Sequence, residues 1–217
     1  SVLESPTADE LQAAFERPTD LLHFVGHCEN SGLRCADGTM AAGVIDECQV
    51  EAFFLNACGS LGFAEKLVER GAAAGAATTR AVFGETAGRV GCNWARLLAH
   101  GWTIERALDV ARSVDDPAGY VAVGDGTCIL TNGDFMLSPE YRIDQSESES
   151  GTIRMLYNTP VKIGTAVYPD VSEKAHLSST GCKVDLHDEK VKEYLCLMDY
   201  PVIDDQIHWD AEEAITD

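Results

Sequence analysis

The chain has 217 residues, of which 45% are apolar, so it is long enough for one domain with a packed core and a smaller appendage. Its 36 acidic residues outnumber the 16 basic ones and give a net charge of -20, which argues against nucleic acid and anionic membranes as partners because both are polyanions. The acidic residues are spread along the whole chain and lysine is scarce. This pattern favours a surface adapted to high salt, and so a halophilic source, over an ordinary acidic protein with basic substrates.

Neither the start of the chain nor its cysteines indicate secretion. No leader with basic and then apolar residues is visible, and no apolar run approaches the length of a membrane span. The eight cysteines are scattered and form no CxxC pair, so zinc-ribbon and thioredoxin sites are not expected. His176, His187 and His208 match no zinc spacing either. We therefore expect a cytoplasmic protein without a metal or other cofactor.

Helices and strands alternate through the first part of the sequence. The predicted elements are a helix over 8–17, a strand over 20–26, a hairpin over 33–40, a strand over 49–56, a helix over 60–70, a small-residue strand over 72–83, helices over 85–100 and 104–114, and strands over 120–123 and 127–131 joined as a hairpin by Gly124-Asp125-Gly126. This order predicts an α/β fold with a largely parallel sheet.

The character of the sequence changes after about residue 137. The acidic, polar stretch Ser146–Gly151 is typical of a loop, and short alternating segments follow it, such as 152–157 and 161–167. We therefore predict three parts. They are an α/β core over 1–137, a linker or exposed loop over 138–151, and a small, mostly β module over 152–217.

Two reactive side chains follow buried strands of the predicted sheet. The strand over 20–26 leads directly into His27, and the strand over 49–56 ends at Ala57-Cys58-Gly59. Functional groups collect at the carboxyl ends of strands in open α/β sheets. A thiol just before a helix lies near the positive end of the helix dipole, which favours the thiolate, and a neighbouring histidine can take its proton.

Structural explanations of the same residues stay open. A cysteine at a strand end is more often a buried structural residue than a nucleophile, and a histidine beside a core strand is more often a hydrogen-bonding residue. The glycines of GETAGRVG, residues 84–91, suggest a phosphate loop only superficially, because the lysine and hydroxyl residue that complete such a loop are missing.

The sequence around both residues resembles a known family. His23-Phe-Val-Gly-His27 and Phe54-Leu-Asn-Ala-Cys58-Gly-Ser are similar to the histidine and cysteine motifs of the CHAT family of caspase-like peptidases, and the similarity extends over roughly residues 8–131. The resemblance implies a three-layer αβα sandwich with a mostly parallel sheet, whose N-terminal strands are missing from this chain. It also implies Cys58 as nucleophile, His27 as base, and the backbone N–H groups of Cys58 and Cys28 as the oxyanion hole.

The chain departs from this family at Cys28 and from the related metacaspases at Asn56. Most members have glycine after the histidine, where this chain has Cys28, so a second thiol stands near the expected nucleophile. In the related metacaspases an aspartate that helps to recognise basic residues occupies the position of Asn56. Asn56 and His23 are the substrate-pocket candidates, although a structural role of Asn56, bonding nearby backbone, is the favoured alternative.

These observations lead to one expected function and two alternatives. The expected function is a cysteine endopeptidase that cleaves a protein or peptide substrate through the Cys58–His27 dyad. The first alternative is a weakly active or inactive caspase-like fold that acts as a protein–protein interaction module, and the second is another α/β hydrolase or transferase with a cysteine nucleophile. An N-terminal recognition domain or a partner chain is expected to complete the sheet.

Overall fold

A computed structural model describes residues 1–82, 84–113 and 119–130, the strands β8 to β14 between residues 139 and 207, and residue 209. The chain divides into two compact units, Ser1–Asn132 and Gly133–Asp217. The elements of the first unit are α1 (Ala8–Phe15), β1 (Thr19–Val25), β2 (Cys28–Glu29), β3 (Gly32–Cys35), β4 (Gly38–Met40), a 3-10 turn (Ala42–Val44), β5 (Val50–Asn56), α2 (Leu61–Glu69), β6 (Ala74–Thr78), α3 (Gly84–Ala99), α4 (Ile104–Ser113) and β7 (Tyr120–Gly124).

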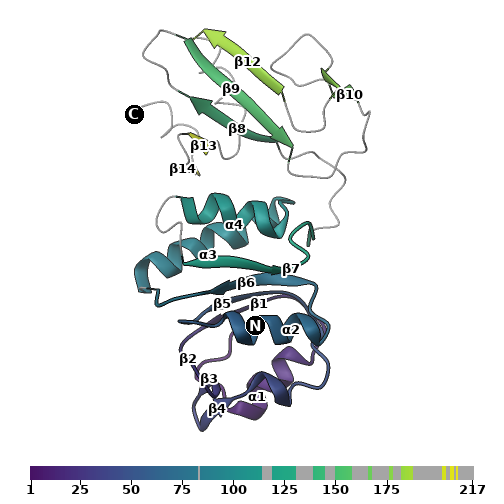
Figure 1. Ribbon diagram of the computed structural model, residues 1–217, viewed down its shortest axis with the longest axis vertical. Coiled ribbons are helices and arrows are strands. Elements are labelled where there is room, and N and C mark those ends of the chain that lie inside the picture. Colours follow the sequence, from purple (N-terminus) through teal and green to yellow (C-terminus); the bar gives the residue numbers. More distant parts are fainter. Residues whose placement is uncertain are drawn as a thin grey trace. The chain divides into compact units, whose positions relative to one another are not determined.

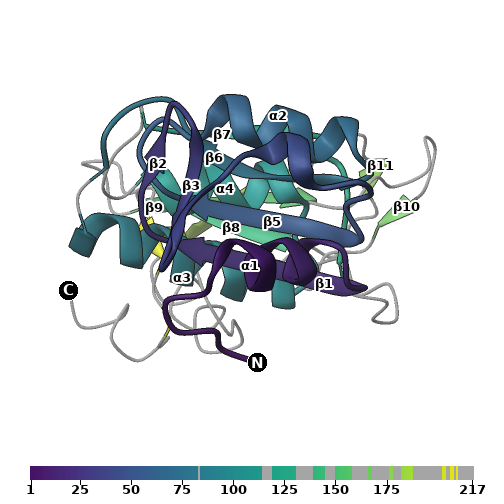
Figure 2. The same ribbon diagram turned by 90° about the horizontal axis from the view of Figure 1, so that it is seen from below.

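The main sheet of the first unit has the strand order β1-β5-β6-β7. Strands β1, β5 and β6 run parallel, and β7 runs antiparallel to β6. Helices α1 and α2 cover one face of this sheet, whereas α3 and α4 cover the other (Figures 1 and 2). The predicted mixed α/β fold with a mostly parallel, open sheet between helices is therefore confirmed.

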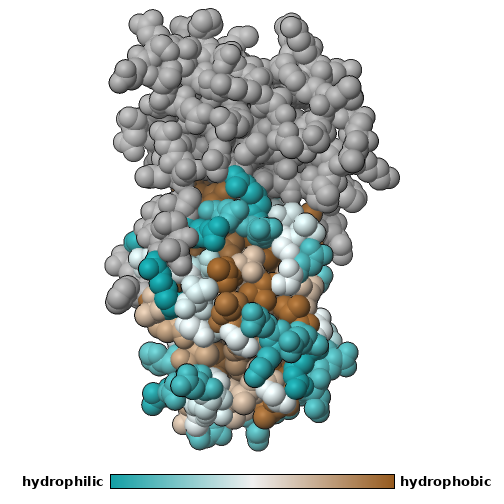
Figure 3. Space-filling model, viewed as in Figure 1, coloured by the Kyte–Doolittle hydropathy of each residue, from teal (hydrophilic) through white to brown (hydrophobic). Residues whose placement is uncertain are grey.

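Strand β5 lies at the centre of the core. Its residues Ala52–Leu55 are each at most 1% exposed, because helices pack on both faces of the strand. This burial explains why the sequence of β5 is a continuous apolar run rather than an alternating one. Trp94 in α3 donates its ring N–H to the carbonyl of Ile104 at 3.1 Å, which connects the two helices on one face. Figure 3 shows apolar side chains gathered at the level of the sheet on the face drawn there.

Local signals in the sequence account for the start of α1. Thr7 accepts a hydrogen bond from the Glu10 backbone N–H at 3.3 Å, and the Glu10 carboxylate accepts one from the Thr7 N–H at 2.9 Å. This reciprocal arrangement is a capping box. Thr7 is therefore the N-cap residue of the helix.

A small sheet, β2-β3-β4, follows the histidine that ends the first strand. The predicted hairpin forms its last two strands. Gly32 begins β3 with a positive φ of 136°, and a Cβ there would lie 1.9 Å from the Met40 carbonyl oxygen, so only glycine fits. The Asp37 carboxylate at the hairpin turn accepts a hydrogen bond from the Ala8 N–H at 2.8 Å. This bond holds the small sheet against the start of α1.

The predicted hairpin over 120–131 is wrong. Strand β7 is present, but residues 125–130 form no strand, and β7 pairs with β6 instead. The chain leaves β7 at Gly124, whose φ is +86°, and the Asp125 carboxylate accepts hydrogen bonds from the N–H and hydroxyl of Thr127, at 3.0 and 2.6 Å. The carbonyls of Gly126 and Cys128 then accept hydrogen bonds from the first N–H groups of α4. The glycines thus turn the chain toward a helix rather than into a strand.

The second unit is described through its strands. These are β8 (Pro139–Asp144), β9 (Ser150–Tyr157), β10 (Ala166–Val167), β11 (His176–Leu177), β12 (Cys182–His187), β13 (Val202–Ile203) and β14 (Gln206–Ile207). Five of them form a sheet in the order β12-β9-β8-β13-β14, and β10 pairs with β11.

The structure differs from the predicted boundary between the parts. The division lies after Asn132 rather than at residue 137, and the stretch 138–151, expected to be a linker or exposed loop, contains β8 and the start of β9. Apolar and polar residues alternate in Tyr141-Arg-Ile-Asp144, which is a strand pattern that the acidic residues after it obscured. The predicted strand over 152–157 lies within β9, and the predicted strand over 161–167 lies mostly outside the described residues.

Candidate functional site

The register of the main sheet brings the two predicted catalytic residues to neighbouring strand ends. Strands β1 and β5 pair residue by residue up to Val25 and Asn56, and the Gly26 N–H then donates to the Asn56 carbonyl at 3.2 Å. His27 and Cys58 each follow two residues after the last pair. Because adjacent strands lie about 4.8 Å apart, this register brings the two backbones close together at the carboxyl edge of the sheet.

The turn that carries Cys58 is held by buried hydrogen bonds to strand β6. Gly59 takes a positive φ of 67°, and Ser60 and Thr78 are both 0% exposed. The Ser60 hydroxyl donates to the Leu55 carbonyl at 3.2 Å and accepts from the Thr78 N–H at 3.1 Å, and the Thr78 hydroxyl donates to the Ala57 carbonyl at 2.5 Å. These bonds connect both sides of the turn to the core, so the backbone of Cys58 has little freedom.

Cys58 itself is half-buried. Its Sγ lies 3.9 Å from the Val82 carbonyl oxygen, in the segment after β6. It lines a cavity of about 520 Å³ together with Cys28, Glu29, Gly59, Gly62, Phe63 and other residues of the β2–β3 turn and the start of α2. Helix α2 begins three residues after Cys58, and the Ser60 side chain makes no capping bond to it. The candidate nucleophile therefore directly precedes the first turn of the helix in the sequence.

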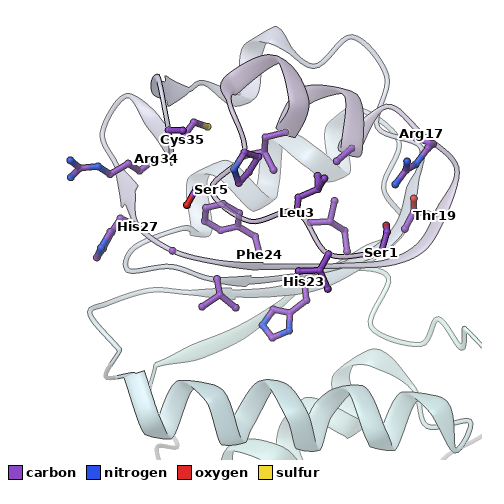
Figure 4. Close-up of a pocket in the computed structure, with 18 of the residues that line it drawn as sticks. Ser1, Leu3, Ser5, Arg17, Thr19, His23, Phe24, His27, Arg34 and Cys35 are labelled. Carbon is purple, nitrogen blue, oxygen red and sulfur yellow. The ribbon is translucent and has the colours of Figure 1, made fainter.

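His27 is exposed at the end of β1. Its backbone carbonyl accepts a hydrogen bond from the Arg34 N–H at 2.9 Å, and its ring has no hydrogen-bond partner within the described residues. The ring borders a different cavity, of about 660 Å³, between β1, α1 and the first residues of the chain (Figure 4). The structure thus brings the backbones of His27 and Cys58 together, whereas their side chains line separate cavities and share no hydrogen bond in the part of the chain described.

The backbone N–H of Cys28 points away from strand β3. His27 and Arg34 are a hydrogen-bonded pair of the β2–β3 hairpin, and hydrogen-bonded and non-hydrogen-bonded pairs alternate in an antiparallel ladder. The next pair, Cys28 and Leu33, is therefore of the non-hydrogen-bonded kind. The N–H of Cys58 likewise has no acceptor among the described residues. Both N–H groups that the family resemblance assigns to the oxyanion hole are accordingly available to a ligand.

The two thiols are close enough to influence each other. Burial raises the pKa of the Cys28 thiol, and the charges of the neighbouring Cys58 and Glu29 raise this pKa further. Both effects favour the protonated form of Cys28.

Asn56, a predicted substrate-pocket residue, is 6% exposed and points into the protein. Its amide nitrogen donates to the Ala87 carbonyl at 2.9 Å, and its oxygen accepts from the Tyr120 hydroxyl at 2.8 Å. The structural role favoured from the sequence agrees with these bonds, but the backbone partner belongs to α3 rather than to a nearby turn. Asn56 does not line the cavity that contains Cys58.

His23, the other predicted pocket residue, packs beneath helix α3 (Figure 4). Its ring meets the Phe54 ring edge-on at 4.9 Å, and a Cβ added at Gly91 would lie 2.8 Å from its Cε1. These neighbours cover part of the ring, and this burial lowers the pKa of His23 although the residue as a whole is exposed. His23 borders the 660 Å³ cavity and not the one beside Cys58.

The sequence reasoning missed Ser60 and Thr78, which fix the turn of the candidate nucleophile. Ser60 follows the cysteine by two residues and opens a helix, so its position suggested at most an ordinary cap. Thr78 lies in a run of small residues with no signal of its own. Only the parallel pairing of β5 with β6 brings the two hydroxyl groups together.

Metal and membrane sites are not visible in the described part of the chain. Among the residues described, no group of three or more His, Cys, Asp or Glu side chains is arranged to bind a metal ion. None of the described helices is both long and apolar enough to cross a membrane. The side chains of His176, His187 and His208 lie outside the described residues.

The first unit is thus an α/β fold with a mostly parallel sheet, and a cysteine and a histidine follow two adjacent strands at its carboxyl edge. No model of a known protein family matches the sequence, and a search of curated proteins finds no match either.

Proposed function

We propose that the first unit is the core of a CHAT-like, caspase-fold cysteine endopeptidase with Cys58 as nucleophile and His27 as base. The observation that carries the proposal is the juxtaposition of these residues at the ends of β1 and β5, with Cys58 on a fixed turn before α2. The free N–H groups of Cys58 and Cys28 support it. The substrate is a protein or peptide, and the Cys58 cavity beside α2 receives part of it.

The chemistry follows from these groups. His27 takes the proton of the Cys58 thiol, and the thiolate attacks the carbonyl carbon of the scissile peptide bond. The two N–H groups stabilise the negative oxygen of the tetrahedral intermediate. This intermediate collapses to a thioester, and His27 returns the proton to the leaving amine. Water then attacks the thioester with His27 again as base, which releases the acid product and restores the thiol.

One movement is needed before this reaction. The Cys58 Sγ lies against the Val82 carbonyl, so the ring of His27 must turn toward it. Since the ring is exposed and has no hydrogen-bond partner within the described residues, little opposes this rotation. Hydrogen bonds of catalytic groups often become short only when the substrate is bound.

The test is the rate at which iodoacetamide labels each cysteine in high salt. Cleavage after glutamate separates Cys28, Cys35, Cys48 and Cys58 into four peptides, so the half-buried Cys35 is an internal reference. We expect Cys58 to react faster than Cys35 well below the ordinary thiol pKa of about 8.5, and to lose this advantage in His27→Ala. The matched control is His100→Ala, which removes an exposed histidine at the end of α3. Equal rates at Cys58 with and without His27 would refute the dyad.

A protein-interaction module is the second candidate function, and the free edge of β1 favours it. In the described sheet β1 pairs only with β5, and its seven residues include no lysine, arginine or proline that would block a further strand. Val25 at its end is 71% exposed. An extended segment from an N-terminal recognition domain or a partner chain would complete the sheet here by strand addition. Slow labelling of Cys58 together with protection of β1 amides on partner binding would favour this function over the peptidase.

A further inference from the structure

Among the six cysteines whose side chains the structure describes, only Cys28 and Cys58 line the cavity beside α2. Both are half-buried and line the same 520 Å³ cavity, and the charge of Cys58 contributes to the raised pKa of Cys28. Cys35 borders the other cavity, and Cys48 is 3% exposed in the core. The pair therefore shares a space that reagents can enter.

The backbone geometry suits a bond between the two sulfur atoms. The register of β1 and β5 ends at the pair Val25–Asn56, so His27 and Cys58 each lie two residues beyond it, and Cys28 is one residue further on. If this spacing continued past the strand ends, at about 4.8 Å between strands and about 3.3 Å along a strand, the Cα atoms of Cys28 and Cys58 would lie roughly 6 Å apart. Disulfides span Cα distances of about 4.4 to 6.8 Å, so no large movement is required.

The surroundings also leave room for the reaction. A Cβ added at Gly59 or at Gly62 would meet no atom within 4 Å, so both positions border open space beside the thiols. Within the described residues the Cys58 Sγ makes one weak hydrogen bond, to the Val82 carbonyl at 3.9 Å, and the Cys28 Sγ lies 3.8 Å from the Glu29 carbonyl. Neither contact is strong enough to hold a sulfur atom in place.

We propose that Cys28 and Cys58 form a redox modification site, in which a peroxide converts the two thiols to a disulfide that blocks Cys58. The Cys58 thiolate attacks the O–O bond of the peroxide and becomes a sulfenic acid, while the other oxygen leaves as water or an alcohol. The Cys28 sulfur then attacks the sulfenic sulfur, the S–O bond breaks and water leaves. Two thiols and one peroxide thus give one disulfide, one water and one further water or alcohol. A dithiol reductant reverses the change.

This proposal extends the proposed function, because it uses Cys58 as the attacking thiolate, but its readout needs no peptide substrate. It also gives a reason for a cysteine at the position where the CHAT-like motif has glycine. Cys28 would be the resolving thiol, which forms the disulfide before Cys58 is oxidised further.

The experiment treats the reduced chain with one equivalent of hydrogen peroxide, blocks the remaining thiols and cleaves after glutamate. Cys28 then lies in peptide 17–29, Cys35 in 30–47, Cys48 in 48–51 and Cys58 in 52–65. We expect peptides 17–29 and 52–65 to be joined, with the loss of two hydrogen atoms, and to separate with dithiothreitol. Iodoacetamide labelling of Cys58 should be lost on oxidation and return on reduction.

Two variants make the result decisive. With a second equivalent of peroxide, which the step from sulfenic to sulfinic acid consumes, Cys28→Ser should leave Cys58 to form sulfinic acid, which dithiothreitol does not reverse. Cys35→Ser, in the same small sheet, should still form the Cys28–Cys58 disulfide with the first equivalent. Oxidation of Cys58 without a link to Cys28, or a link to Cys35 or Cys48, would overturn the proposal. A failure of this proposal can be distinguished from a failure of the proposed peptidase function, because the iodoacetamide labelling rates of the reduced protein test only the Cys58–His27 dyad.

Discussion

Thr78→Val tests whether the turn at Cys58 is held from strand β6. Valine has nearly the shape of threonine and suits a strand, so the substitution removes a hydroxyl group and little else. That hydroxyl donates to the Ala57 carbonyl at 2.5 Å and accepts from the Ser60 N–H at 3.5 Å. Both partners lie in the core, where Ala57 is 1% and Ser60 0% exposed, and water cannot replace the lost group.

The size of the effect follows from these two bonds. A buried polar group left without a partner costs about 1–3 kcal/mol. The bond to Ala57 is short, whereas the bond to Ser60 is at the limit of hydrogen-bond length and contributes little to the free energy of unfolding. We therefore expect Thr78→Val to lower the free energy of unfolding by about 2 kcal/mol. Urea unfolding measures this change through the shift of the midpoint at constant slope.

The control is the same substitution one residue further along the chain. Thr79 is exposed, and its hydroxyl makes one long bond, of 3.4 Å, to the Gly119 carbonyl. Thr79→Val should therefore stay within about 0.5 kcal/mol of the unchanged protein. Hydrogen exchange should also become faster at residues 58–60 in Thr78→Val only. If the two variants are equally stable, the hydroxyl of Thr78 does not hold the turn and the reasoning is refuted.

Two further predictions concern His23 and its neighbours. Gly88→Ala should stabilise α3 by about 0.5–1 kcal/mol because its Cβ meets nothing within 4 Å. Gly91→Ala should lose this gain to the contact of 2.8 Å with His23 and recover part of it in a His23→Ala background, where the contact of 3.3 Å with Phe54 remains. Urea midpoints of the single and double variants measure this coupling, and equal effects at Gly88 and Gly91 would contradict the packing. The second prediction concerns pH. Burial lowers the pKa of His23 in the folded state, so the unfolded chain binds the proton more readily, and stability should fall as the pH drops below about 6.5. The decline should be smaller in His23→Gln; identical pH profiles would show that the ring is not desolvated.

Much of the first unit could be predicted from its sequence because the decisive interactions there are local. The capping box at Thr7 and Glu10 and the apolar run of β5 depend on neighbours in the chain. The segment after Gly124 was mispredicted because glycine allows several kinds of turn. The turn that forms is determined by hydrogen bonds to the start of α4, about 20 residues earlier in the sequence. In the same way, acidic residues near 146 suggested a loop, although strand pairing extends on both sides of them.

In the candidate site, too, contacts between residues far apart in the sequence could not be predicted. The order of strands follows from the α/β alternation, so the neighbouring positions of His27 and Cys58 were predictable. The contacts of Asn56 were not, because its partners, Ala87 and Tyr120, come from elements 31 and 64 residues away. The pairing of Ser60 with Thr78 likewise depends on the register between two strands.

The Cys58 side of the candidate site is more strongly constrained by the surrounding structure than the His27 side. The Cys58 side belongs to the central strand β5, and buried hydroxyl groups connect its turn to β6. The His27 side follows an edge strand, and its ring is exposed and without a hydrogen-bond partner within the described residues. Local openings occur first where few buried contacts oppose them, so a disturbance at the edge of β1 acts on His27 before it reaches Cys58. If Cys58 and His27 act as the proposed dyad, we expect the reactivity of Cys58 to depend on the position of the histidine more than on the thiol's own turn. The comparison of His27→Ala with Thr78→Val separates these two contributions.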